Sequence, residues 1–398
     1  MSAMSRIVFF CIPAHGHTNP TLGVVRELVE RGHEVWYYSY EFLREKIEAA
    51  GAVFVSCDEE TAEQKLTPKE SARVGSDLAF STKLLVDTTL ALDERVCADM
   101  ERLQPDCIVA DSMAVWGKAV ALKRGIPFVS STTTFAFNQH SAKVMKQSPW
   151  QLLRMLVSMP KINRHLKRLQ ERGYPVKSVL DIIRNDDKTH TVVYTSPAFQ
   201  PCAETFSKTH YAFVGPSIRP AADRVEKTGD KLIYISMGTV NNDLLPLYKN
   251  CIAALKDTGY QVILSLGNLV DPEQLGPLPN GISVFPQVDQ SAVLEKADAF
   301  ITHCGMNSVS ESLYFGVPLI MLPQTAEQGG VAARVRQLGA GVQLEQTTPE
   351  AIKTAVEQVL RDSAYGRSAA AIAEGFRACP GAKGAADKIL AVCGENPK

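Results

Sequence analysis

The chain has 398 residues, of which 45% are hydrophobic, and its 42 Lys and Arg nearly balance its 43 Asp and Glu. This composition is typical of a globular protein and excludes a disordered, collagen-like or coiled-coil chain. The absence of a net basic charge argues against a general nucleic-acid binder, and the length predicts two domains.

The nine cysteines include no Cys-x-x-Cys pair, and no apolar run is long enough to cross a membrane. An odd number of scattered cysteines predicts reduced, mostly buried thiols and a cytoplasmic protein. The apolar run 7–12 after Arg6 has some features of a signal peptide, but Pro-Ala-His-Gly-His follows it where a cleavage site needs small residues.

The first half of the chain alternates short β-branched runs with helical patterns. Strands separated by helices of this length predict parallel βαβ units with right-handed crossovers. The expected strands are 6–12, 34–39, 107–110 and 128–131, and the expected helices are 20–31, 42–50 and 115–124.

Segment 140–185 interrupts this alternation with long helical patterning, which predicts an inserted helical subdomain. From 143 to 172 it carries eight Lys or Arg and a single acid, Glu171. Three interpretations stay open: a solvated basic face, a weak contact with a membrane surface, or recognition of an acidic acceptor.

The residues 216–230 contain prolines, a glycine and mixed charges, which are typical of an exposed linker. The alternation then restarts, so we expect a first domain over 1–215 and a second over 231–398, with a C-terminal helix able to pack back on the first domain. Expected strands are 231–236, 261–266, 282–285, 299–302 and 317–322, and expected helices are 244–256, 307–315 and 330–338. Ligands of doubly wound sheets bind at the carboxyl ends of strands, so functional motifs should follow strands directly.

Two such positions in the first half suit acid–base chemistry. His15 and His17 follow the first strand, and a histidine there can act as a base on a hydroxyl. Asp111 ends another strand and can orient that imidazole. The alternatives are a surface histidine in a loop where Asn19 caps a helix starting at Pro20, and an aspartate that is an ordinary helix cap.

The second half contains Ser236-Met-Gly238-Thr239 after a strand, a weak phosphate-binding signal. A more specific string starts at His303, continues through Gly305, Asn307, Ser308 and Glu311, and is followed by Glu327-Gln328. Its glycine and hydroxyl residues lie where a helix begins, and a helix N-terminus binds phosphate oxygens. The alternative is a buried histidine beside a capped helix. The chain has no Gly-x-Gly-x-x-Gly after its first strand, which argues against a dinucleotide oxidoreductase, and it has no P-loop motif.

Together these motifs resemble those of the UDP-glycosyltransferase family, and in particular its bacterial macrolide glycosyltransferase (MGT) subfamily. The resemblance spans nearly the whole chain and includes Gly-His-x-Asn-Pro, Phe-Val-Gly-Pro at 213–216, Ser-x-Gly-Thr and His-Cys-Gly-x-Asn-Ser-x-x-Glu. It implies the α/β GT-B fold, in which two Rossmann-like, doubly wound domains face each other across a central cleft.

The resemblance also implies roles for individual residues. His17 would be the catalytic base and Asp111 its partner, with His15 a less suitable neighbour. The donor-binding set would be Ser236, Gly238, Thr239, Gln290, His303, Gly305, Asn307, Ser308, Glu311, Glu327 and Gln328, in which the residues from 303 to 308 hold the pyrophosphate, Glu311 the ribose and the last two the hexose.

The chain departs from the family pattern where an aromatic residue usually stacks on the base. Gln287 stands at the position of the usual tryptophan and Asp289 at that of the proline, which leaves the preference for UDP or TDP open. Met306 replaces the tryptophan that often follows His-Cys-Gly, and its thioether can still pack there.

We therefore expect an inverting, metal-independent transfer of a hexose, with glucose favoured, from a UDP-sugar co-substrate to a hydroxyl of a small apolar or aromatic natural product such as a flavonoid, phenol, macrolide or steroid. No other cofactor and no nucleic acid is expected, and the chain would be a monomer or homodimer. The acceptor residues would be Phe80, Phe135, Phe137 and Met145, which can equally be plain core. The alternatives are a nucleotide-sugar epimerase and a non-catalytic sugar-nucleotide-binding protein.

Overall fold

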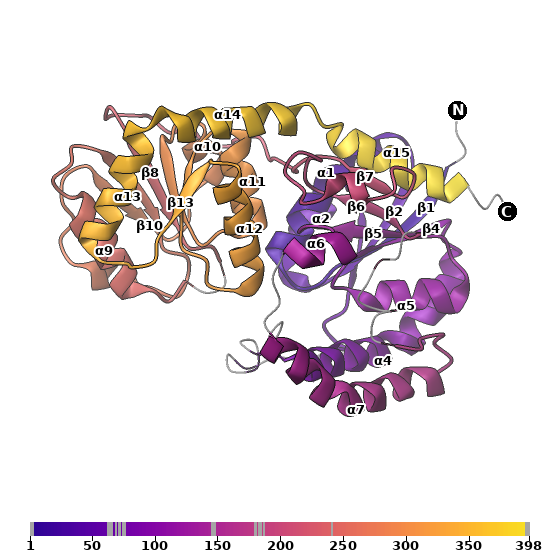
Figure 1. Cartoon of the computed structure of the whole chain (residues 1–398). Coiled ribbons are helices and arrows are strands. Elements are labelled where there is room, and N and C mark those ends of the chain that lie inside the picture. The colour runs from indigo at the N-terminus through magenta and orange to yellow at the C-terminus, as the bar shows by residue number, and fades with distance from the viewer. Residues whose placement is uncertain are drawn as a thin grey trace. The chain divides into compact units, whose positions relative to one another are not determined.

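The computed structural model describes residues 4–394 except 62–66, 68–69, 71–72, 74–76, 145–148, 179–180, 182–184, 186–187 and 240–241. Two compact units make up the chain, and both belong to the α/β class (Figure 1). Unit 1 comprises Met1–Ser217 together with Pro380–Lys398, and unit 2 comprises Ile218–Cys379. The last helix, α15 (Gly381–Gly394), is therefore part of unit 1, where it packs on α1.

Unit 1 is built on a parallel sheet with the strand order β3-β2-β1-β4-β5-β6-β7. β3 and β7 are its edge strands, and these two strands and β6 have only three or four residues each, too few to stand out in the hydrophobic pattern. The strands are β1 (Arg6–Phe10), β2 (Glu34–Ser39), β3 (Val53–Ser56), β4 (Cys107–Asp111), β5 (Phe128–Thr132), β6 (His190–Val193) and β7 (Tyr211–Phe213). Its helices are α1 (His15–Glu30), α2 (Arg44–Glu48), α4 (Leu78–Leu103), α5 (Val115–Arg124), α6 (Gln139–Val144), α7 (Pro149–Glu171) and α15, with short 3₁₀ turns at Glu41–Leu43 and Ala203–Thr205.

Helix α1 begins five residues before the predicted start at Pro20. Extended Ala14 is its N-cap, and the backbone N–H groups of His17 and Thr18 already donate to the Ala14 carbonyl. The prediction that Asn19 caps the helix is therefore wrong. Pro20 lies inside the helix, where the missing N–H costs one hydrogen bond. As a result, both histidines of the motif lie in the first turn of α1.

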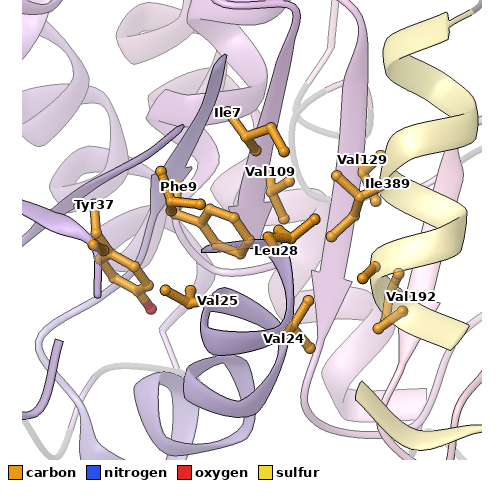
Figure 2. Close-up of a cluster of buried hydrophobic side chains, with 14 of the residues drawn as sticks. Ile7, Phe9, Val24, Val25, Leu28, Tyr37, Val109, Val129, Val192 and Ile389 are labelled. Atoms are coloured by element: carbon orange, nitrogen blue, oxygen red, sulfur yellow. The ribbon is translucent and has the colours of Figure 1, made fainter. Parts of the chain in front are cut away.

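One face of the unit 1 sheet is covered by α1 and α15. Figure 2 shows Leu28 of α1 and Ile389 of α15 meeting strand residues such as Phe9 and Val109 in one apolar cluster. These four side chains are at most 1% exposed. Burial of a side chain of this size contributes about 1.5–3 kcal/mol. The C-terminal helix is therefore an integral part of the core of this unit.

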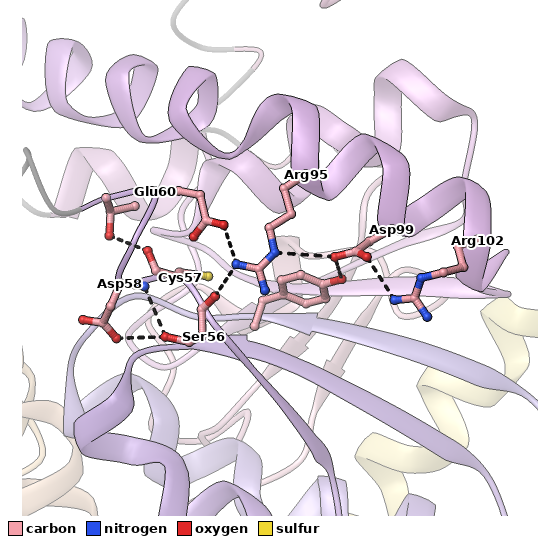
Figure 3. A network of polar contacts seen from close by, with 9 residues as sticks. Ser56, Cys57, Asp58, Glu60, Arg95, Asp99 and Arg102 are labelled. Atoms are coloured by element: carbon pink, nitrogen blue, oxygen red, sulfur yellow. Dashed lines mark hydrogen bonds and ion pairs between the residues drawn. The ribbon is translucent and has the colours of Figure 1, made fainter.

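The opposite face carries α4, α5 and α7, and charged groups join these helices. Asp93 of α4 accepts hydrogen bonds from the Lys123 ammonium and the Tyr174 hydroxyl, both at 2.7 Å. Burial alone would raise the pKa of Asp93, but the hydrogen bonds from Lys123, Tyr174 and Cys97, together with the Lys123 charge, outweigh it and lower the pKa. In a second network (Figure 3), Arg95 of α4 contacts Glu60 and the Ser56 carbonyl. Helix α4 is thus tied to β3, α5 and the chain after α7.

Unit 2 has a second parallel sheet, with the strand order β10-β9-β8-β11-β12-β13. Buried aliphatic residues of β8 and β11 occupy its centre. The strands are β8 (Leu232–Ser236), β9 (Gln261–Ser265), β10 (Ile282–Phe285), β11 (Ala299–Thr302), β12 (Leu319–Met321) and β13 (Gly341–Gln343). Its helices are α9 (Leu245–Leu255), α10 (Gln290–Leu294), α11 (Met306–Tyr314), α12 (Ala326–Gln337), α13 (Pro349–Arg361) and α14 (Ser363–Arg377), with a 3₁₀ turn at Pro272–Leu275.

Both sheets have the same kind of switch point. From β1 the chain first builds outward through β2 and β3, then returns to the other side of β1 with β4. Unit 2 does the same from β8 to β9 and β10, then to β11. The connections at a switch point leave in opposite directions, which opens a crevice at the carboxyl ends of the two strands. Within the described residues, no helix has the length and apolar character that crossing a membrane requires.

Candidate active site

The switch point of unit 1 brings His17 and Asp111 together. His17 follows β1 and Asp111 ends β4, the strand that pairs with β1 in parallel register. The His17 Nδ1 atom is 2.8 Å from Asp111 Oδ2, although the two residues are 94 positions apart in the chain. The structure thus places side by side the two strand-end residues that the sequence analysis proposed as a pair.

The surroundings of this pair determine what it can do. The Asp111 side chain is fully buried, and its Oδ1 accepts the backbone N–H of Met113 at 2.8 Å. Both carboxylate oxygens are therefore engaged, which fixes the orientation of the carboxylate. A carboxylate facing Nδ1 favours the tautomer with a proton on that nitrogen and leaves Nε2 as the basic atom. The His17 side chain is 21% exposed, so a bound molecule can reach it.

Sequence reasoning missed Thr133, which follows β5 next to β4 in the sheet. Its Oγ1 is 3.1 Å from His17 Nδ1, and the residue is 3% exposed. A signal existed, because Thr133 also comes directly after a strand. It was hidden in the run Thr132-Thr133-Thr134, where the sequence does not show which hydroxyl points to the histidine. His15 instead packs edge-on against Phe42 at 5.4 Å between ring centroids.

The predicted acceptor residues lie in different environments. Phe135 is 3% exposed and packs on Phe199, so it belongs to the core of unit 1, whereas Phe137 is 46% exposed. Phe80 is partly buried in the first turn of α4, with Arg73 above its ring. Met145 lies outside the described residues.

Two further exposed apolar side chains follow the strands next to β1, and neither was predicted from the sequence. Phe42 follows β2 and is 56% exposed, and Met113 follows β4 and is 41% exposed. Since β2 and β4 are the two neighbours of β1, Phe42 and Met113 follow the strands on either side of the strand that precedes His17. Exposed apolar groups beside a histidine–aspartate pair suit an apolar molecule bound at this edge.

The switch point of unit 2 places His303, after β11, beside the loop that follows β8. A Cβ atom on Gly238 would lie 2.6 Å from the His303 ring, and one on Gly305 would lie equally close. Gly238 has a φ of 79°, which side-chain-bearing residues rarely adopt. The imidazole is therefore held between two glycine backbones, which explains the need for glycine at both positions. Ser236 ends β8 and is 8% exposed, and Thr239 follows in the same loop.

Burial lowers the pKa of His303 to about 4, although the Ser236 backbone acts in the opposite direction. The imidazole is therefore neutral near pH 7. A neutral imidazole supplies one N–H donor and no positive charge.

The start of α11 adds further donors beside this imidazole. Gly305 is the N-cap and supplies no side-chain cap for the first turn, which contains Asn307 and Ser308. The first N–H groups of a helix have no partner within the helix, and together with the helix dipole they favour an anion. Buried Cys304 has a φ of 67°, a conformation uncommon outside glycine, which marks a constrained turn at this point.

Glu311 lies one turn further along α11 and is mostly buried. The Gln290 amide donates to Glu311 Oε2 at 2.6 Å, and the Tyr234 hydroxyl donates to the Gln290 carbonyl at 3.3 Å. Burial raises the pKa of Glu311, and the Gln290 hydrogen bond and the charge of Arg219 oppose the rise. The structure thus brings Gln290, Ser308 and Glu311 into one polar cluster.

In the segment before α10, where the sequence departs from the family pattern, Asp289 has a structural role. Asp289 is the N-cap of α10, and its Oδ2 accepts backbone N–H groups of Ala222 and Asp223. It thereby anchors the stretch that the sequence identified as a linker. Gln287 is exposed, and Phe285 before it is 43% exposed.

Glu327 and Gln328 lie in the first turn of α12. The Gln328 carbonyl accepts the backbone N–H groups of Gln324 and Thr325, and Thr325 Oγ1 accepts the Gln328 N–H. This capping box engages the Gln328 oxygen, and its amide nitrogen is the atom that can still donate to a ligand. Glu327 is exposed beside it.

Residues 188–375 match the family model described as UDP-glucoronosyl and UDP-glucosyl transferase. The chain is 32% identical to the NDP-glycosyltransferase YjiC of Bacillus licheniformis, over 97% of each protein. It is also 32% identical to the demethyllactenocin mycarosyltransferase of Streptomyces fradiae, over 90% of this chain and 80% of that protein. The crystal structure of the kitacinnamycin glycotransferase superposes with a TM-score of 0.86 at 26% identity, covering 98% of this chain and all of that one.

Two Rossmann-like units with polar clusters at their switch points define a GT-B glycosyltransferase, and the structural match confirms the predicted fold class. The chain belongs to the UDP-glucuronosyl and UDP-glucosyl transferase family, as a member of the macrolide type. It is therefore an enzyme that binds a nucleotide sugar and an acceptor.

Proposed function

We propose that the protein is an inverting glucosyltransferase that uses UDP-glucose and glycosylates a hydroxyl of a small apolar or aromatic natural product. The observation that carries this proposal is the His17–Asp111 pair, with 2.8 Å between Nδ1 and Oδ2 and the carboxylate fully buried. A base oriented in this way can remove the proton of an acceptor hydroxyl through Nε2. The acceptor oxygen then attacks the anomeric carbon directly, and a single displacement inverts its configuration.

Asp111 would stabilise the imidazolium that forms as His17 takes the proton. The carboxylate takes up no proton itself, and the histidine returns to its neutral form when the proton leaves from the imidazolium to solvent. These two roles explain why Asp111 is fully buried and His17 is partly exposed. A low dielectric around Asp111 strengthens its attraction to the imidazolium, and the exposure of His17 lets the acceptor reach it.

The diphosphate of the donor would bind at the start of α11. The backbone N–H groups at the start of α11 and the N–H of the neutral His303 are donors that would stabilise negative charge on the leaving diphosphate. Glu311 and Gln290 would receive the ribose hydroxyls, and the first turn of α12 the hexose. On this proposal the transfer needs no divalent metal, because backbone dipoles and hydrogen bonds supply the stabilisation.

The acceptor class is inferred from unit 1. Phe42, Met113 and Phe137 are exposed apolar side chains after β2, β4 and β5, on the same sheet edge as His17. The name of the Streptomyces fradiae relative, a mycarosyltransferase acting on demethyllactenocin, supports an acceptor of natural-product type. The description of the matched family supports glucose as one of two sugars that it names.

The test is release of UDP from UDP-glucose with a panel of phenolic, macrolide and steroid acceptors, for wild type and His17→Ala, with and without EDTA. Acceptor-dependent release that is lost in the variant and insensitive to EDTA is the expected result. Release without any acceptor would contradict the proposal and point to an epimerase or hydrolase. Thermal stabilisation by UDP-glucose with no release for any acceptor would contradict the acceptor class.

A further inference from the structure

We propose that Thr133 is a positioning residue of the catalytic base: its hydroxyl is a second acceptor for the proton on His17 Nδ1, beside Asp111, and holds the imidazole in its reactive tautomer. This inference rests on the proposed role of His17 as base. It concerns a residue that contacts the base and is too deeply buried to contact an acceptor freely, since Thr133 is only 3% exposed.

The sheet explains how three distant residues reach one nitrogen atom. β1, β4 and β5 are consecutive neighbours, and Ala110 and Asp111 of β4 pair with Ser130 and Ser131 of β5. Residues just beyond the carboxyl ends of these strands are therefore level with one another. In this way Asp111 and Thr133 approach His17 from adjacent strands, at 2.8 Å and 3.1 Å from Nδ1.

The protonation of His17 Nδ1 determines the direction of its hydrogen bonds with Asp111 and Thr133. Asp111 is a carboxylate and can only accept, so Nδ1 must carry the proton that it donates. With that proton in place Nδ1 has no free lone pair, and the Thr133 hydroxyl oxygen can then only accept from it. The N–H is therefore shared between two acceptors, which is the arrangement that favours the Nδ1 tautomer and leaves the Nε2 lone pair for the acceptor hydroxyl.

The other titratable groups near the pair do not compete for this role. Burial raises the pKa values of the Cys11 thiol and the Tyr194 phenol, and the nearby Asp111 charge raises them further. Both groups are therefore neutral at working pH. His15, on the same turn of α1, contacts Phe42. Within the described residues, Asp111 and Thr133 both place an oxygen within hydrogen-bond distance of the His17 Nδ1 atom.

Replacing Thr133 by valine tests this role because valine has nearly the same shape and no hydroxyl. Loss of one acceptor for a charged donor predicts a fall in kcat of about tenfold, with the KM for acceptor and donor unchanged. The imidazolium loses a stabilising partner, so the acid limb of the pH–rate profile moves to lower pH, by about half a unit or more. Thr133→Ser keeps the hydroxyl and should restore both quantities to near wild-type values.

Thr134→Val is the matched control, because it removes the neighbouring hydroxyl, which donates to the Phe135 carbonyl at 3.5 Å. It should leave kcat and the acid limb unchanged. An acid limb that stays in place in Thr133→Val, or the same change in Thr134→Val, would overturn the proposal. If Thr133→Val does not fold by circular dichroism, Thr133→Ala is compared with Thr133→Ser under the same criteria.

A His17→Ala variant measured alongside separates the two levels of the proposal. If this variant keeps full activity, His17 is not the base and the proposed function fails at its mechanism. If it is inactive while Thr133→Val matches wild type at every pH, the base stands and only the positioning role of Thr133 fails.

Discussion

Asp111→Asn is the substitution that tests the catalytic pair most directly. The asparagine side chain has the same shape and can keep its oxygen on the Met113 N–H, so its amide nitrogen would face His17 Nδ1. An N–H donor there requires a lone pair on Nδ1 and moves the proton to Nε2. The histidine then presents a donor, in place of a base, to the acceptor hydroxyl.

The size of the effect follows from the geometry. In the wild type the imidazolium that forms during proton transfer faces the Asp111 carboxylate, with charge centres about 4 Å apart, and their attraction is about 4 kcal/mol at an effective dielectric constant of 20. Loss of that energy in the transition state corresponds to a fall in kcat of about 10³-fold. The change of tautomer adds to this loss.

The assay is UDP release at saturating UDP-glucose and acceptor, with thermal stabilisation by UDP-glucose as a separate measure of donor binding. Donor binding should stay at the wild-type level, because the predicted donor residues belong to unit 2. Asp106→Asn is the matched control: Asp106 precedes the other end of β4, where its Oδ2 accepts the Arg6 backbone N–H at 2.8 Å. An Asp111→Asn enzyme within tenfold of wild type would refute the reasoning, as would an equal loss in Asp106→Asn.

Three further perturbations probe the donor site and the framework around α4. Gly238→Ala places a methyl group 2.6 Å from the His303 ring at a positive φ, so it should abolish thermal stabilisation by UDP-glucose. Gly366→Ala is the control, because its methyl group would meet no atom within 4 Å, and it should leave this stabilisation unchanged. Equal donor binding by both variants would contradict the close contact between Gly238 and His303. Burial lowers the pKa of His303 to about 4 in the folded protein, against an ordinary value of 6.5, so the unfolded chain binds more protons between these two pH values. The contribution of the neutral imidazole to the free energy of unfolding is therefore fully present above pH 6.5 and falls by about 3 kcal/mol as the pH is lowered to 4. The Tm of His303→Gln should fall less over this interval, and parallel melting curves for the two proteins would argue against a buried neutral imidazole. Asp93→Ala leaves the Lys123 ammonium without its carboxylate and should lower the free energy of unfolding, measured by denaturant melts, by about 3 kcal/mol. Asp387→Ala breaks the exposed ion pair with Arg31 and should lower it by less than about 1 kcal/mol. A smaller loss in Asp93→Ala than in Asp387→Ala would refute the role of the buried network.

The sequence by itself determined the fold class and the positions of the site motifs. Short β-branched runs separated by helical patterns define parallel βαβ units, and polar residues directly after strands lie at the carboxyl edge of a sheet whatever the rest of the chain does. For this reason His17, Asp111 and the string from His303 to Glu311 were found without a structure. Their roles in binding and catalysis stay predictions, because geometry alone does not test them.

The sequence analysis paired His17 with Asp111, but only the tertiary structure shows the contact between them and the third residue, Thr133, that joins it. The register of β1, β4 and β5 brings Asp111 and Thr133, which are 94 and 116 positions from His17, to the same imidazole nitrogen, and sequence spacing carries no information on register. Likewise, the first turn of α1 forms before Pro20 because the Ala14 carbonyl accepts the first hydrogen bonds there, and α15 joins unit 1 because its apolar face is buried against α1. Such outcomes depend on long-range packing, which local propensity does not encode.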